Sequence, residues 1–107
     1  MKNNHTLTEL TELIMQQAEA KGFGTSPNDI SVAEKIALIH TEVSEAYTAY
    51  RHKNLTGKDG FNEELGDIIQ RVLHLAGVMG VDLEAEILKK LEVNKDRTWE
   101  WNKLNER

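Results

Sequence analysis

The sequence of 107 residues has no cysteine, a single proline and only 6% aromatic residues. The absence of cysteine excludes disulfides, thiolate zinc sites and cysteine nucleophiles. No apolar run approaches the roughly 20 residues that span a membrane, and the N-terminal segment MKNNHTLTEL lacks the hydrophobic stretch of a signal peptide. We therefore expect a cytoplasmic protein with no membrane partner.

Basic residues are also in the minority, because 13 Lys and Arg stand against 18 Asp and Glu and the net charge is −5. This balance argues against a broad basic surface that binds a nucleic-acid polymer. It leaves room for a small phosphorylated ligand, since a metal ion can supply positive charge locally. The length fits one domain over residues 1–107. The core of so small a domain is limited, which favours pairing with a second copy.

Helical spacing of apolar residues runs through the chain and no segment reads as a strand. The signals for helix ends are two capping boxes, Thr6 with Glu9 and Ser31 with Glu34, a C-cap at Gly80 and an N-cap at Asp82. The predicted helices cover about residues 6–21, 32–52, 61–79 and 83–97. Their short connections predict an all-α fold, a four-helix bundle-type subunit that oligomerises through helix packing.

Carboxylates stand beside apolar residues in the second predicted helix. Glu42 and Glu45 lie in one row with Leu38 and Ala49, because these positions are separated by four, three and four residues. The row borders the apolar stripe of the helix. Two acids one turn apart repel each other, so their place beside an apolar stripe calls for an explanation.

The third predicted helix repeats this pattern. Glu64 and Asp67 are three residues apart and share a face with Ile68 and Leu75, so they should point inward. Burying such carboxylates without compensation costs several kcal/mol each or forces protonation. A divalent cation held between the two helices would resolve the conflict, and Mg²⁺ prefers oxygen ligands of this kind. A solvated helix face is the simpler interpretation of either pair alone.

A di-iron carboxylate bundle is the alternative metal site, and it requires the motif Glu-x-x-His. The residues three positions before the four histidines are Lys2, Ala37, Ala49 and Arg71, so the motif is absent. Ligation by oxygen alone favours Mg²⁺, with Mn²⁺ as the other candidate.

A basic row follows in the fourth predicted helix. Lys90, Asn94 and Arg97 are spaced four and three, which places them on one face that begins with Leu83 and Ile87. This face should turn from apolar to polar inside the bundle, where the cations could offset phosphate charge. Structural ion pairs and the usual preference for cations at a helix C-terminus are the alternatives.

Three segments resemble the motifs of a known family. HTEVSEA (residues 40–46), EELGD (63–67) and KLEVNKDR (90–97) resemble the MazG-like branch of the all-α NTP pyrophosphohydrolases. The family pattern is EExxE, a spacer and ExxD, followed by Lys, Asn and Arg at helical spacing. The spacer here is residues 46–63, which is 18 positions, and the resemblance extends from about residue 30 to residue 97.

The resemblance implies a reaction, an assembly and a set of site residues. The reaction cleaves a nucleoside triphosphate between the α- and β-phosphates, giving a monophosphate and pyrophosphate. The assembly is a homodimer or a dimer-based homotetramer with the site at or near the subunit interface. The implied ligands of Mg²⁺ are Glu42, Glu45, Glu64 and Asp67, and the implied phosphate contacts are Lys90, Asn94, Lys95 and Arg97.

The first acidic position of the EExxE motif is Thr41 in this chain. This departure leaves open the number of metal ions and the identity of the general base. Glu42 or Glu45 is the candidate that orients or deprotonates the attacking water. Phe23 and Trp99 are the candidates for stacking on a nucleobase, with simple packing as the alternative for both.

Three functions fit these features. The first is a nucleotide-pool enzyme that acts on canonical, deoxy or damaged nucleoside triphosphates. The second is a pyrophosphatase restricted to one pyrimidine, such as dUTP or dCTP. The third is a non-catalytic oligomerisation module that keeps the metal as a structural staple. The presence of all four acids and of the Lys90–Asn94–Arg97 row favours an enzyme.

Overall fold

The computed structural model describes residues 4–97, which form four α-helices and one short 3₁₀ helix and contain no strand. The predicted all-α class is therefore confirmed. None of the helices in this described part has the length and apolar character needed to cross a membrane. The elements are α1 (Leu7–Lys21), η1 (Pro27–Asp29), α2 (Val32–Arg51), α3 (Phe61–Met79) and α4 (Leu83–Lys95).

The capping residues predicted from the sequence set the helix ends. Thr6 forms a complete capping box with Glu9, and Ser31 Oγ accepts a hydrogen bond of 3.2 Å from the Glu34 N–H. Gly80 ends α3 in the left-handed conformation with φ 68°, where glycine has no steric penalty. Asp82 Oδ1 then accepts from an N–H of the first turn of α4 at 3.0 Å.

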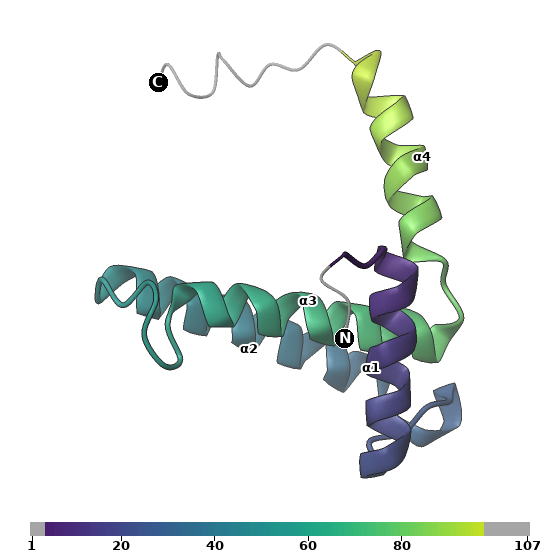
Figure 1. The fold of residues 1–107 in the computed structure, drawn as a ribbon, viewed down its shortest axis with the longest axis horizontal. Coiled ribbons are helices and arrows are strands. Elements are labelled where there is room, and N and C mark those ends of the chain that lie inside the picture. The colour runs from purple at the N-terminus through teal and green to yellow at the C-terminus, as the bar shows by residue number, and fades with distance from the viewer. Residues whose placement is uncertain (1–3, 98–107) are drawn as a thin grey trace.

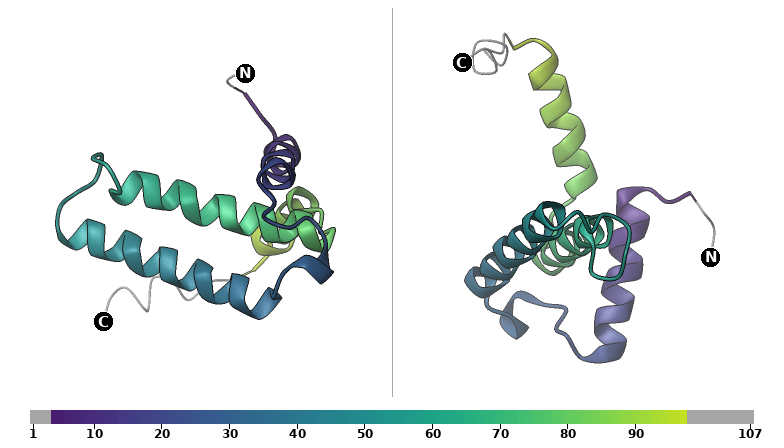
Figure 2. Two further views of the ribbon diagram at one scale, coloured as in Figure 1. Left: turned by 90° about the horizontal axis from the view of Figure 1, so that it is seen from below. Right: turned by 90° about the vertical axis from the view of Figure 1, so that its left-hand side faces the viewer.

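Helices α2 and α3 lie side by side and run in opposite directions (Figures 1 and 2). The buried residues of α2 are Ala46 and Ala49, and those of α3 include Leu73 and Ala76. Small side chains let two helix backbones approach closely. Polar groups that face each other across the two helices therefore come close together.

One asparagine organises the loop that joins these two helices. Asn54 Oδ1 accepts from the Gly57 N–H at 3.1 Å, and Asn54 Nδ2 donates to the Lys58 carbonyl at 3.2 Å. The Asn54 carbonyl accepts from the Phe61 N–H, the first residue of α3, at 2.9 Å. These bonds fix where α3 starts relative to the end of α2, and so which residues of the two helices face each other.

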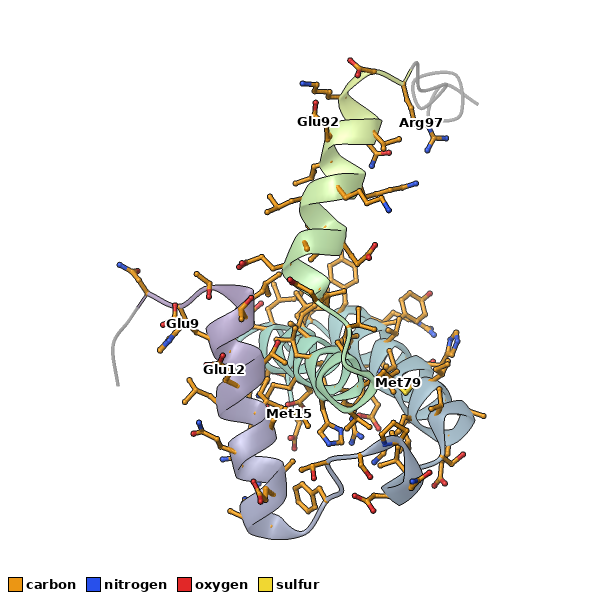
Figure 3. All side chains as sticks on the ribbon, turned by 90° about the vertical axis from the view of Figure 1, so that its right-hand side faces the viewer. Glu9, Glu12, Met15, Met79, Glu92 and Arg97 are labelled. Carbon is orange, nitrogen blue, oxygen red and sulfur yellow. The ribbon has the colours of Figure 1, made fainter. Side chains whose placement is uncertain are left out.

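Helix α1 crosses α3 steeply near the end of α3 (Figure 1). Met15 lies on the side of α1 that faces α3 (Figure 3). A Cβ atom added to Gly77 would lie 2.6 Å from Met15 Sδ and 3.2 Å from Thr11 Cγ2. Because Gly77 has no side chain, α3 has a notch at this position, and α1 packs into it.

Helix α4 leaves the other three helices after its first turn (Figures 1 and 2). Glu84 anchors that turn, because its carboxylate accepts from the Leu7 N–H at 3.1 Å and from Thr8 Oγ1 at 3.4 Å. Beyond it, Leu88 and Leu91 are 61% and 59% exposed. The arrangement thus differs from a closed bundle, because the apolar side of α4 has no cover within the described chain.

Two glycines of α3 should respond oppositely to an added side chain. Gly66→Ala meets no atom within 4 Å, so the better helix propensity should stabilise the protein by up to about 1 kcal/mol. Gly77→Val should destabilise it by about 1–3 kcal/mol, because the side chain overfills the notch against α1. Urea unfolding followed by circular dichroism at one protein concentration measures both. A stabilising Gly77→Val would show that α1 does not pack at this notch.

Candidate metal centre

Three of the four acids singled out in the sequence come together between α2 and α3. Glu42, Glu64 and Asp67 each offer a carboxylate oxygen, and these oxygens lie within 4.8 Å of one another. We call these three residues the acidic trio. The spacing of the acids places them on the facing sides of α2 and α3. The small side chains of Ala46 and Ala49 let those two sides approach closely. The trio could hold a metal ion, and its all-oxygen donor set suits a hard cation.

Glu64 is the buried member of the trio, with only 6% of its surface exposed. Its Oε2 atom is buried and has no hydrogen-bond partner among residues 4–97. The pKa of Glu64 is raised from 4.5 to about 7, foremost by its hydrogen bond with Glu42, then by burial, then by the charges of Glu42, Glu45 and Asp67. An unpaired carboxylate oxygen in a crowd of negative charge is stabilised either by a proton or by a cation.

Glu42 is held by an arginine from α3. Arg71 Nε donates to Glu42 Oε1 at 3.1 Å, and the Glu42 side chain is 12% exposed. The bond offsets part of the negative charge of the trio while no cation is bound. It also fixes the direction of the Glu42 carboxylate relative to Glu64 and Asp67.

Three further residues of the acidic motifs lie outside the trio. Glu45 is exposed, yet its charge still contributes to the raised pKa of Glu64. Thr41 Oγ1 donates to the Ala37 carbonyl at 3.2 Å, so its hydroxyl is bound within its own helix. Glu63 accepts a hydrogen bond from the Asp59 N–H at the start of α3. These contacts give Thr41 and Glu63 local structural roles.

A pocket of about 450 Å³ opens beside the trio. This volume is within the range of small-ligand sites. Glu42 and Asp67 form part of its wall, and Phe23 forms another part. The pocket therefore joins a candidate metal centre to an exposed aromatic side chain. Its lining residues are Ile14, Gln17, Ala18, Phe23, Lys35, Glu42, Asp67, Gln70, Arg71 and His74.

Phe23 owes its place in the pocket to the turn that follows α1. Gly22 adopts a left-handed conformation with φ 72°, and the Phe23 N–H donates to the Ala18 carbonyl at 2.9 Å. His74 Nε2 then lies 3.0 Å from the Gly24 carbonyl, and since a carbonyl only accepts, the histidine is the donor. The turn is thus tied to α3, and Phe23 remains 60% exposed.

The basic row of α4 is not part of this pocket. Lys90, Lys95 and Arg97 are exposed, whereas the spacing predicted that their face would point to the interior. Arg97 lies just beyond the end of α4 that is farthest from α1 to α3 (Figure 3). Lys95 Nζ pairs with Glu92 at 2.7 Å. Asn94 is half-buried, and Trp99 lies outside the described residues.

The pocket also contains residues that the sequence interpretation missed. Lys35, Arg71 and His74 line it, and none was assigned a role from the sequence. Their spacing carried a signal, because Asp67, Arg71 and His74 are separated by four and three residues. Lys35 likewise precedes Glu42 by seven residues, which is two helical turns. A search for cations on the acid-bearing faces would have found them.

Comparisons with protein-family models, with curated protein sequences and with solved structures found no match to this chain. The resemblance to MazG-like pyrophosphohydrolases therefore depends on the sequence motifs described above.

The raised pKa of Glu64 predicts an unusual dependence of stability on pH. Between pH 4.5 and about 7 the folded protein keeps a proton on Glu64 that the unfolded chain releases. The free energy of unfolding attributable to this group therefore falls as pH rises through that window. A cation that replaces the proton should reverse the loss. We expect the Tm of the metal-free protein to fall over this range, and added Mg²⁺ or Mn²⁺ to raise it most at the upper end.

The matched variant is Glu64→Gln, which cannot ionise. Its Tm should change less over the same pH range and should respond less to added cation. Thermal unfolding with and without a chelator measures both effects. Equal pH profiles and equal metal responses in the two proteins would contradict the assignment of Glu64.

Proposed function

We propose that this chain is a Mg²⁺-dependent nucleoside triphosphate pyrophosphohydrolase that serves in nucleotide-pool clean-up. The observation that supports it most is the buried Oε2 atom of Glu64, which has no hydrogen-bond partner among residues 4–97 and belongs to a trio of carboxylates at the edge of a pocket of about 450 Å³. The metal centre alone fits many reactions. The pocket and the resemblance of the motifs narrow it to a phosphorylated ligand.

Glu42, Glu64 and Asp67 would hold the cation, with Mg²⁺ favoured and Mn²⁺ as the alternative. Once bound, Mg²⁺ would withdraw charge from the phosphate oxygens and ease attack by water. The carboxylates contribute by fixing the position of the ion. The bound cation would in turn offset the negative charge that the empty trio presents to an anionic substrate.

Glu45 is the stronger candidate for the general base. It is exposed beside the trio and lies outside the set of oxygens that could share the cation, so its carboxylate remains available to water. Glu42 is the alternative. In the reaction, one P–O bond forms to water and the P–O bond of the α–β anhydride breaks. The carboxylate takes the proton of the water, and pyrophosphate leaves with the electron pair of the broken bond.

Phe23 is the candidate platform for the nucleobase. Its ring is 60% exposed and lines the same pocket as Glu42 and Asp67. Aromatic rings stack on any base, so this contact predicts little discrimination between bases. Stacking on Phe23 therefore favours an enzyme with a broad range of nucleotide substrates over one restricted to a pyrimidine.

We further propose that the enzyme pairs with a second copy of itself through α2 and α3. An apolar groove on these helices is lined by Val43, Ala46, Tyr47, Tyr50, Phe61, Leu65 and Ile68. Tyr47, Tyr50 and Leu65 are 62%, 61% and 45% exposed. Charge complementarity favours a second copy as the occupant, because the chain holds its acidic trio apart from the basic end of its own α4. A partner's α4 would bring Lys90 and Arg97 toward the trio.

The enzymatic proposal predicts release of pyrophosphate from nucleoside triphosphates in the presence of Mg²⁺. Glu64→Gln and Glu45→Gln should each lower kcat by about two orders of magnitude or more, as expected for loss of a metal ligand or a general base. The measurement is pyrophosphate release across a panel of ribo- and deoxynucleotides. Glu12→Gln is the matched control, since Glu12 is exposed on α1 and does not line the pocket (Figure 3).

Release of orthophosphate instead of pyrophosphate would refute cleavage at the α–β bond. No turnover of any nucleotide, with cation binding intact, would favour the non-catalytic module. Turnover of a single pyrimidine nucleotide would favour the restricted enzyme.

The dimer proposal predicts complementation between two inactive subunits. Glu64→Gln lacks a functional trio and Lys90→Gln lacks a phosphate contact, so each protein alone should be nearly inactive. Mixed dimers contain one site with both parts intact, and random mixing should restore about a quarter of the wild-type activity. Leu65→Glu, placed in the apolar groove, should give monomers by light scattering. Two inactive variants that stay inactive after subunit exchange would show that α4 of a partner does not complete the site.

A further inference from the structure

We propose that Lys35 and Arg71 form the anion-binding pair of the pocket, and that Arg71 passes from Glu42 to the anion when the trio takes a cation. The inference rests on the proposed function only in identifying the anion as the phosphate chain of a nucleotide. It assigns roles to two residues of α2 and α3. It also places phosphate contacts in the same chain as the metal ligands, in addition to any that α4 supplies.

Lys35 is a cation that lines the pocket and forms no ion pair within the described residues. The residue is half-buried, and no carboxylate of residues 4–97 lies close enough to Lys35 Nζ to form an ion pair. Burial of a charge costs free energy unless the charge finds a partner. Glu42 lies two turns along the same face of α2. An anion that reaches from the trio along the pocket would therefore meet the ammonium group of Lys35.

Arg71 is only partly engaged by its carboxylate. Nε donates to Glu42 Oε1 at 3.1 Å, while the two terminal nitrogens make no hydrogen bond with residues 4–97. The side chain is 41% exposed and lines the pocket. A guanidinium with two free terminal amino groups has the planar fork that binds phosphate oxygens in pairs.

The contact with Glu42 couples the two ligands. A cation in the trio and the guanidinium of Arg71 both draw on the charge of Glu42, so binding of the cation weakens the hold of Glu42 on Arg71. The released guanidinium then lies beside the bound cation with its full donor set available. Cation and anion should therefore each raise the affinity of the other, because such coupling is reciprocal.

Binding measurements test this with no need for turnover. The variants are Arg71→Gln and Lys35→Met, and the control is Lys58→Met, whose lysine is exposed in the loop between α2 and α3. Calorimetry gives the affinity for Mn²⁺ alone and, with saturating Mg²⁺, the affinity for inorganic tripolyphosphate. The same titration with a nucleotide whose α–β bridge is an uncleavable methylene group reports on the nucleotide itself.

In Arg71→Gln the affinities for the cation and for the anion should change in opposite directions. Arg71→Gln should bind Mn²⁺ more tightly, because a competitor for Glu42 is gone, and should bind tripolyphosphate roughly tenfold more weakly or worse. Lys35→Met should weaken tripolyphosphate to a similar degree without weakening Mn²⁺. Lys58→Met should change neither affinity. Arg71→Lys, which keeps the charge and loses the fork, should fall between wild type and Arg71→Gln.

Weaker Mn²⁺ binding in Arg71→Gln would overturn the inference, because it would mean that Arg71 only orients Glu42. Unchanged tripolyphosphate affinity in both pocket variants would overturn it as well. Failure of the enzymatic proposal looks different. A wild-type protein that binds Mg²⁺ and tripolyphosphate through these residues, yet cleaves no nucleotide, would leave the anion-binding pair standing.

Discussion

Crowding of negative charge at Glu64 is the constraint on which the rest of this structure depends. A carboxylate that is 6% exposed lies against Glu42 and Asp67, and one of its oxygens has no hydrogen-bond partner in the described part of the chain. A fold selected for stability alone would place an apolar residue at this position, because an uncompensated buried charge is costly. A bound cation would offset the unfavourable free energy of this buried charge. The neighbouring pocket gives a ligand access to the trio.

The packing of α2 on α3 is what makes the crowding possible. Ala46 and Ala49 let the helices approach closely, and the Asn54 loop sets the register so that acids oppose acids. Because small residues occupy much of the space between the helices, large apolar side chains such as Tyr47 and Leu88 remain outside the core. The chain thus has a well-defined site and an incompletely covered surface, and both follow from a core in which alanine predominates.

Local features of this fold were predictable, and relations between distant elements were only partly so. Helix ends follow from caps such as Thr6 and Gly80, whose effect is confined to neighbouring residues. The trio was predictable in part because helical periodicity places the acids on known faces and a short loop makes α2 and α3 neighbours. The course of α4 was not predictable, since its apolar pattern shows that it needs a cover but not which surface provides one.

The tie between His74 and the Gly24 carbonyl has a consequence for how the pocket responds to acid. A neutral ring protonated at Nε2 and a doubly protonated ring both donate to a carbonyl, so this bond survives a change in the charge of the histidine. Cation binding by the carboxylates at the other side of the pocket does depend on pH, because a proton and a cation compete for them. A cation held by the acidic trio would therefore be released on acidification, while the turn that carries Phe23 keeps its shape. The two sides of the pocket would thus respond to acid separately.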